Sequence, residues 1–190
     1  MKKLKSIQGI PISYIQSIVK INLNSPSGLT WLPREGTSRY TKSWNARYAN
    51  KPAGSKCIDK RYKNPRWNTM VFYNGKQWHL KCHRIIFLLH NGYLTKGKCI
   101  DHIDNNPSNN NSDNLRELLQ SQNLCNSKVP KTNTSGYKGV YCHKATSKWR
   151  VMIMVNDKLH YFGLYVNKED AIKVAIAARK KLHGEFGRDE

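Results

Sequence analysis

The sequence has few acidic residues, no long hydrophobic run and no paired cysteines. Its 190 residues carry 12 Asp and Glu against 33 Lys and Arg, a formal net charge of +21. Such an excess weakens compaction by self-repulsion and usually indicates a polyanionic partner, with nucleic acid first and an anionic membrane surface second. The longest apolar run, IIFLL at 85–89, is far too short to span a bilayer. The first 20 residues are too interrupted by polar side chains to form a signal peptide. We therefore expect an intracellular, cytoplasmic protein without a membrane partner.

The cysteines exclude some classes of protein. There are five, an odd number, and none forms a CxxC pair. This pattern argues against a disulfide framework and favours reduced, mostly buried thiols. A zinc site assembled from scattered Cys and His side chains stays open.

The positive charge is unevenly distributed. Residues 1–100 contain only Glu35 and Asp59 as acidic groups, and residues 137–190 are again basic. Residues 101–136 are nearly neutral and rich in Asp and Asn. This distribution predicts a metal site between surfaces that hold phosphates.

Local patterns predict an α+β protein. The stretch TMVFYNGKQWHL reads as two strands joined by Asn74-Gly75 in a type I′ turn, and a helix that stops at Gly92 follows. Residues 128–136 read as a linker. Beyond them we expect three strands and one helix, which Asn167 would cap and Gly184 would end.

The motif IDHID places a carboxylate, Asp101, beside an imidazole, His102. Cleaving a phosphodiester requires an activated water and neutralisation of charge on the phosphate and the leaving oxygen. A histidine can act as the general base, and a hard divalent cation takes carboxylate and amide oxygens as ligands. Adjacent side chains of a strand point to opposite faces, so this pair needs a bend or two different tasks.

Residues 100–126 resemble the HNH nucleases, also called the His-Me finger or ββα-metal family, in the branch of phage homing endonucleases. The resemblance rests on Asp101-His102, then Asn114-Leu115-Arg116, then Asn123, and it extends upstream to about residue 28. It implies that His102 activates water and that Asn114 orients its imidazole. Asp101 and Asn123 would hold one Mg²⁺ or Mn²⁺ per active site, and the products would carry 5′-phosphate and 3′-hydroxyl ends.

Other residues of this region keep alternative interpretations. Asn105, Asn106 and Asn109–Asn111 read as turn residues, because Asn tolerates left-handed backbone. Asn126 competes with Asn123 for the metal. His83 is either a buried structural histidine or a supporting or phosphate-binding group.

The C-terminal part resembles the plant ethylene-response-factor (Apetala-type) DNA-binding domain. The resemblance rests on YKGV at 137–140, Lys148-Trp149, Phe162-Gly163 and HGEFG at 183–187. It departs at Tyr141, His143 and Tyr161, where the plant domains have two arginines and a tryptophan. The candidates for the DNA face are Lys138, Tyr141, His143, Lys148, Arg150 and Tyr161. In the N-terminal region, where basic and aromatic residues alternate, the candidates are Arg34, Arg39 and Arg47.

These observations predict a metal-dependent DNA endonuclease with three parts. Residues 1–127 would form an HNH domain with irregular β-hairpins and a basic extension, 128–136 a linker, and 137–190 a three-stranded antiparallel sheet packed on one helix. The expected partner is double-stranded DNA, bound by a monomer or a DNA-induced dimer in a phage-infected host, with no small-molecule cofactor. Two alternatives stay open: a DNA-binding regulator on a degenerate HNH fold, and a structural nucleic-acid-binding protein.

Overall fold

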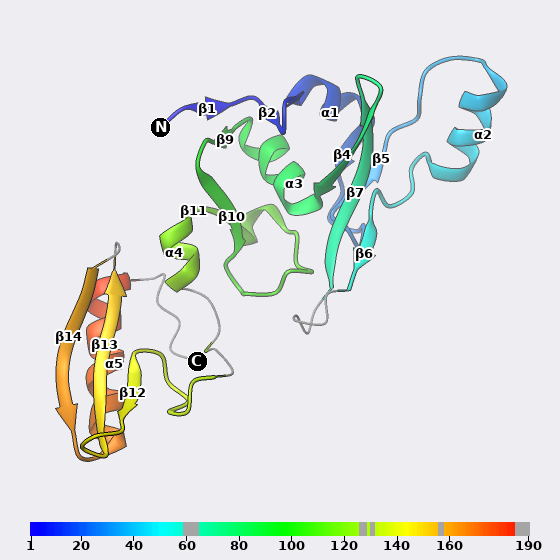
Figure 1. Ribbon diagram of the computed structural model, residues 1–190. Helices are drawn as coiled ribbons and strands as arrows, with labels where there is room; N and C mark the ends of the chain where they lie inside the picture. The colour runs from blue at the N-terminus through cyan, green and yellow to red at the C-terminus, as the bar shows by residue number, and fades with distance from the viewer. Residues whose placement is uncertain (59–64, 126–128, 130–131, 156–157, 185–190) are drawn as a thin grey trace. The chain divides into compact units, whose positions relative to one another are not determined.

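The computed structural model describes residues 1–58, 65–125, 129, 132–155 and 158–184 (Figure 1). The chain divides into two compact units, Met1–Glu117 and Leu118–Glu190, and each is described by itself. The expected α+β class is confirmed, since small antiparallel sheets accompany helices. The domain limits expected from the sequence stay predictions. Within the described ranges, no helix is long and apolar enough to cross a membrane.

The first unit is built from short strands and helices in two-stranded and three-stranded sheets. The two-stranded sheets pair β1 with β9, β2 with β3, β4 with β5 and β10 with β11, and the three-stranded sheet has the order β6-β7-β8. The last two residues of β11 fall in the second unit. The elements are β1 (Lys3–Leu4), β2 (Ser6–Ile7), β3 (Ile10–Pro11), α1 (Ile12–Ile18), β4 (Val19–Ile21), β5 (Leu29–Trp31), α2 (Arg39–Tyr48), β6 (Ser55–Cys57), β7 (Arg66–Tyr73), β8 (Lys76–Lys81), α3 (Cys82–Asn91), β9 (Leu94–Thr95), β10 (Lys98–His102), the short 3-10 helix η1 (Ser112–Asn114) and β11 (Leu115–Leu119).

The predicted hairpin is confirmed as β7 and β8. Tyr73 pairs with Lys76 across a two-residue turn, and the φ angles of Asn74 and Gly75 are 50° and 70°. Positive φ at both central positions defines the type I′ turn, whose twist matches that of the strands.

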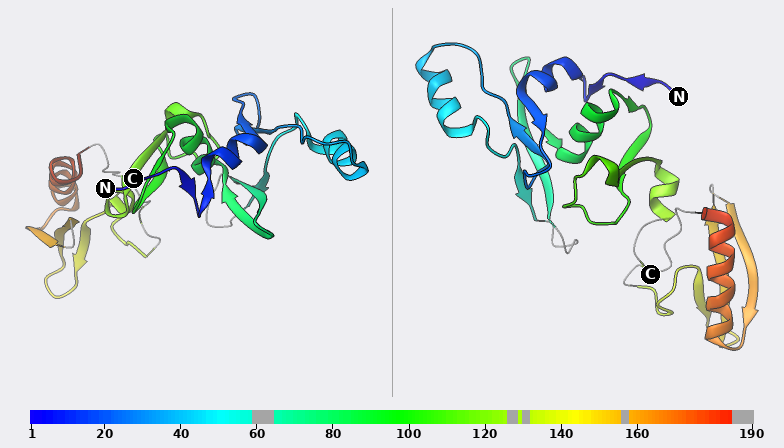
Figure 2. Two further views of the ribbon diagram at one scale, coloured as in Figure 1. Left: turned by 90° about the horizontal axis from the view of Figure 1, so that it is seen from above. Right: turned by 180° about the vertical axis from the view of Figure 1, so that it is seen from behind.

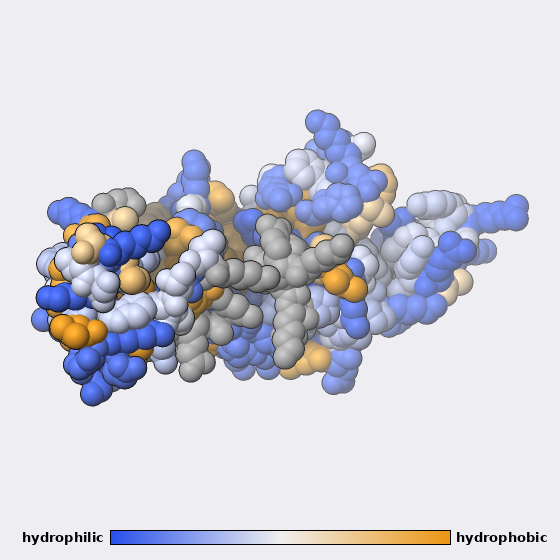
Figure 3. Space-filling model, turned by 60° about the horizontal axis from the view of Figure 1, so that its bottom comes forward, coloured by the Kyte–Doolittle hydropathy of each residue, from blue (hydrophilic) through white to orange (hydrophobic). Residues whose placement is uncertain are grey.

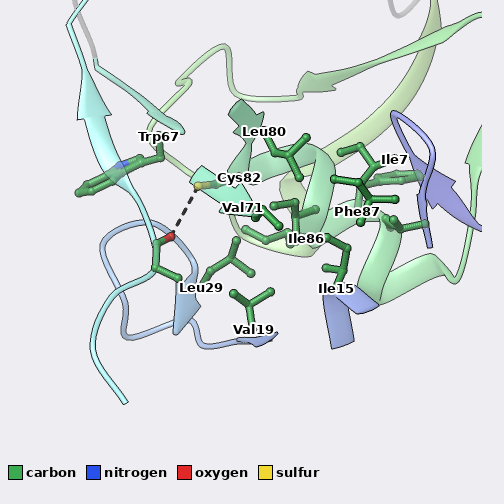
Figure 4. Packing of buried hydrophobic residues seen from close by; sticks show 14 of the residues in the cluster. Ile7, Ile15, Val19, Leu29, Trp67, Val71, Leu80, Cys82, Ile86 and Phe87 are labelled. Carbon is green, nitrogen blue, oxygen red and sulfur yellow. Dashed lines mark hydrogen bonds between the residues drawn. The ribbon is translucent and has the colours of Figure 1, made fainter. Parts of the chain in front are cut away.

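Helix α3 follows this hairpin and lies in the core of the unit (Figure 4). Ile85, Ile86 and Leu88 are fully buried. The helix ends where Gly92 takes the left-handed conformation, as predicted. Cys82 at its start donates a hydrogen bond to the Ala53 carbonyl at 3.8 Å, and burial raises the pKa of its thiol to about 12. The thiol therefore stays protonated and belongs to the packing.

The second unit is a sheet covered on one face by a helix (Figure 2). Val140, Val151, Ala171 and Ala175 form its buried core. Gly184 ends the helix as expected, but Asn167 makes no capping hydrogen bond; its amide instead contacts Asp170 at 3.4 Å. The elements are α4 (Gln120–Cys125), β12 (Val140–His143), β13 (Lys148–Val155), β14 (Lys158–Tyr165) and α5 (Lys168–His183).

Candidate functional site

The Asp-His pair lies at the end of β10, where the strand enters the loop of residues 103–111. The two side chains have different surroundings. Asp101 Oδ2 forms an ion pair with Arg116 Nη2 at 3.5 Å. His102 is buried, with 7% of its surface exposed, and its ring meets that of His83 edge-on at a centroid distance of 5.0 Å. The strand thus separates a carboxylate from an enclosed imidazole.

The environment of His102 favours the neutral imidazole. Desolvation by burial is the largest effect and lowers its pKa, and the charge of Arg66 on β7 acts in the same direction. A hydrogen bond with Asn110 and the charges of Asp101 and Asp104 oppose this shift without overcoming it. A neutral imidazole can accept a proton, which a general base must do.

The amide that contacts His102 is Asn110, where the sequence analysis expected Asn114. His102 Nε2 lies 3.0 Å from Asn110 Oδ1. The backbone of Asn114 pairs with Ile103, one residue beyond the histidine, and its side chain turns into the loop. There it accepts from Asp104 N at 3.0 Å and donates to Asp104 Oδ1 and to the Asn109 carbonyl, both at 2.9 Å.

Asp104 is the centre of the hydrogen bonds that shape this loop. It also accepts from Asn106 N at 2.8 Å and from Asn109 Nδ2 at 2.7 Å. Burial raises the pKa of this carboxyl, but the hydrogen bonds from Asn109, Asn106 and Asn114 outweigh burial, so the pKa is lowered. The ionised carboxylate and Asn114 together fix the loop that carries Asn110.

Two residues beside the imidazole were missed or left open by the sequence analysis. Asn110 was interpreted as a turn residue, yet it is 5% exposed and hydrogen-bonds at both ends of its amide. His83 packs against His102, and burial and nearby positive charges lower its pKa to about 3; both its structural and its supporting interpretation stay predictions. No local pattern marks Asn110, since the Ser27 carbonyl that its amide contacts is 83 residues away in the sequence.

The donor set of the expected metal site is only partly described. Asn123 lies in α4, which belongs to the second unit, and Asn126 lies outside the described residues. Among described residues, no group of three or more His, Cys, Asp or Glu side chains could hold a metal. One carboxylate with amide oxygens suits a hard cation that keeps several other ligands, such as Mg²⁺, so Asp101 fits that role.

The sheet of the second unit brings most of its predicted DNA-binding residues onto one face. Tyr141 lies opposite Arg150, and His143 lies opposite Lys148. Tyr161 lies opposite Met152. Met152 is two residues after Arg150 on β13, so Tyr161 lies on the same face of the sheet as Arg150. Figure 3 shows hydrophobic and hydrophilic residues interspersed over this unit.

Lys138 is set apart from the other candidates for the DNA face. It precedes β12, and its Nζ donates to the Cys125 carbonyl at 3.0 Å.

The N-terminal candidates lie on or beside α2, which buries no side chain and stands away from α3 (Figures 1 and 2). Arg34 stacks on Trp44 at 3.9 Å from the ring centroid, and its backbone is held by Asn45. Arg39 and Arg47 begin and nearly end the helix and are exposed. The helix therefore presents cations beside aromatic rings.

Comparisons with known proteins agree with this site. Residues 80–124, which include α3 and the whole Asp-His loop, match the family model described as HNH endonuclease. Protein 3.8 of Escherichia phage T7 is 38% identical over 120 residues, 62% of this chain and 93% of that protein. The chain therefore belongs to the HNH endonuclease family.

A solved structure is also similar to this chain. Described as "DNA binding and cleavage by the HNH homing endonuclease I-HmuI", it covers 96% of this chain and 91% of its own, with 18% identity and a TM-score of 0.42. Similarity at this level is too low to transfer residue roles.

Proposed function

We propose that this protein is a metal-dependent DNA endonuclease of the homing type, which hydrolyses a phosphodiester to 5′-phosphate and 3′-hydroxyl ends. The observation that carries the proposal is a buried imidazole, His102, whose lowered pKa favours the neutral form, next to the carboxylate of Asp101. Both residues lie inside the segment that matches the HNH family model. A phage-infected bacterium is the proposed setting, because the T7 relative is a phage protein.

In this proposal His102 removes a proton from the water that attacks phosphorus. Its burial supports the role because desolvation disfavours the charged form before the reaction. Asp101 and Asn123 would hold one Mg²⁺ or Mn²⁺, which when bound supplies charge neutralisation at the leaving 3′ oxygen. For this task Asp101 would exchange its ion pair with Arg116, whose Nη2 lies 3.5 Å from Oδ2, for the cation.

Two surfaces would hold double-stranded DNA. The sheet face of Tyr141, Arg150 and Tyr161 offers cations among exposed aromatic rings, and α2 with Arg34 offers a second set. Phosphate contacts of this kind fix a protein on a duplex without reading its sequence. The protein would act as a monomer or as a dimer formed on DNA.

A non-catalytic DNA-binding regulator is the second candidate. The ion pair between Asp101 and Arg116 favours it, because a carboxylate already neutralised by a guanidinium has less charge to offer a cation. The two candidates differ in one outcome: the regulator binds DNA and leaves the phosphodiester intact.

Plasmid cleavage tests the proposal. Supercoiled DNA incubated with the protein and Mg²⁺ should become nicked or linear, and EDTA should prevent this. The ends should be joined by DNA ligase without prior phosphorylation, since they carry 5′-phosphate. Protein that shifts DNA on a gel yet leaves plasmid intact with Mg²⁺ and with Mn²⁺ would support the regulator instead.

A further inference from the structure

Asn110 connects the imidazole of His102 to a separate part of the first unit. Its Oδ1 lies 3.0 Å from His102 Nε2, and its Nδ2 donates to the Ser27 carbonyl at 3.0 Å. Ser27 is fully buried and Asn110 is 5% exposed, so water has little access to either contact.

The Ser27 carbonyl decides which way the amide faces. A carbonyl oxygen only accepts hydrogen bonds, so the NH₂ end of Asn110 must face it. The oxygen end of the amide then faces His102, and Oδ1 also only accepts. The neutral imidazole must therefore carry its hydrogen on Nε2, and its lone pair lies on Nδ1.

We propose that Asn110, aligned by the Ser27 carbonyl, is a positioning residue that holds His102 in the Nε2–H tautomer and leaves Nδ1 free to accept the proton of the attacking water. The proposal rests on the proposed function only where it says that Nδ1 accepts the proton of the attacking water. The tautomer itself follows from the geometry, whether or not the protein cleaves DNA.

The turn of residues 22–28 is built to keep the Ser27 carbonyl in place. Its backbone is closed by hydrogen bonds from Asn22 N to the Gly28 carbonyl and from Gly28 N to the Ser25 carbonyl, at 3.0 and 2.9 Å. Ser25 Oγ and Ser27 Oγ both donate to the Leu29 carbonyl. The carbonyl therefore has little freedom to turn away from Asn110.

Gly28 allows the close approach between this turn and the loop. Its φ is +78°, and a Cβ there would lie 3.1 Å from Asn110 Cβ and 2.6 Å from Ile86 Cδ1. Any side chain at this position would push the turn away from Asn110. On the other side, Asp104 and Asn114 hold the loop that carries Asn110.

The ¹⁵N chemical shifts of the His102 ring test the tautomer without any cleavage assay. The signals are assigned as those that disappear in His102→Ala, and the protein is kept free of metal. Wild-type protein should show a protonated Nε2 and an unprotonated Nδ1. Asn110→Ala should convert this pattern to a mixture of the two tautomers. A protonated Nδ1 in the wild type, or an unchanged pattern in Asn110→Ala, would overturn the proposal.

Cleavage rates test the consequence. Asn110→Ala should leave DNA affinity unchanged and lower the single-turnover rate about 10- to 100-fold, the loss typical when the hydrogen-bond partner of a metal-ligating histidine is removed. Asn24→Ala, at an exposed asparagine, is the control and should match the wild type. Asn110→Asp keeps an acceptor oxygen beside Nε2, although it loses the donor to the Ser27 carbonyl, and should keep the hydrogen on Nε2; it also serves if the alanine variant does not fold. An Asn110→Asp ring pattern like that of a free histidine would contradict the proposal.

Failure of this proposal and failure of the proposed function are distinguishable. A wild-type protein that lacks all cleavage but shows the Nε2–H pattern would refute the nuclease and retain the positioning role of Asn110. A protein that cleaves DNA but carries the hydrogen of the neutral His102 ring on Nδ1 would support the nuclease and refute the positioning role of Asn110.

Discussion

At the scale of single residues, burial of His83 should be measurable as acid sensitivity. Its pKa is about 6.5 in the unfolded chain, and burial with the charges of His102, Lys81, Arg66 and Arg84 lowers it to about 3 in the folded protein. Between these values only the unfolded chain takes up the proton, so the free energy of unfolding falls as the pH falls. The decrease is at most about 1.4 kcal/mol per pH unit in this window.

Urea denaturation at pH 7, 5.5 and 4.5 checks this prediction. His83→Phe keeps an aromatic ring beside His102 and should reduce the decrease in stability on acidification. His79→Phe, at an exposed position of β8, is the matched control and should remain more acid-sensitive than His83→Phe. Equal decreases in the two variants would mean that His83 is not buried as described.

The hydrogen bonds of Asn114 should be visible as stability. Asn114→Ala removes its hydrogen bonds with Asp104 and Asn109 and should lower the free energy of unfolding by about 1–3 kcal/mol. Cleavage should slow because the loop that carries Asn110 loosens. Asn24→Ala, at an exposed asparagine, should have little effect on unfolding. A stable Asn114→Ala protein with wild-type cleavage would exclude a loop-holding role.

At the scale of elements, the sheet face of the second unit predicts a difference between two variants of equal charge. Arg150→Ala removes a cation between Tyr141 and Leu164, while Lys173→Ala removes one from α5, which covers the other face of the sheet. DNA affinity, measured by fluorescence anisotropy, should fall several-fold for Arg150→Ala, since base or phosphate contacts contribute about 1–3 kcal/mol. It should change less than about twofold for Lys173→Ala. Equal decreases would mean that only net charge matters.

Helix α2 predicts an effect on the salt dependence of binding. Changing Arg34, Arg39 and Arg47 together to Ala should reduce the slope of log K against log salt by up to about 0.9 for each phosphate that is no longer neutralised. Arg34→Lys keeps the charge and removes the guanidinium stacking on Trp44, so it should retain the slope. An unchanged slope in the triple variant would remove α2 from the interface.

Elements with a local cause were predictable from the sequence. Asn74-Gly75 determines its turn through the two residues themselves, and alternation in β13 places Val151 and Ile153 in the core. Asp101 and His102 were singled out because they are adjacent and begin the HNH pattern; their roles stay predictions. The partner of His102 was not, because Asn110 is selected by the Ser27 carbonyl, 83 residues away. Amides in an asparagine-rich loop look alike until the fold decides which one is buried.

At the scale of the whole molecule, the net charge of +21 and the HNH site point to the same substrate. In the proposed function the basic residues would account for attraction to DNA but not for cleavage, which a charged surface alone does not perform. The central claim is therefore that His102 supplies catalysis while other residues supply binding. A single variant, His102→Ala, should therefore lose cleavage and keep DNA binding.

The most direct test compares His102→Ala with the wild type for DNA binding and for Mg²⁺-dependent plasmid cleavage on the same samples. The cleavage rate of His102→Ala should be lower by about 100- to 10,000-fold, the usual contribution of a general base, with DNA affinity within about twofold of the wild type. A His102→Ala protein that cleaves plasmid as fast as the wild type would contradict the central claim.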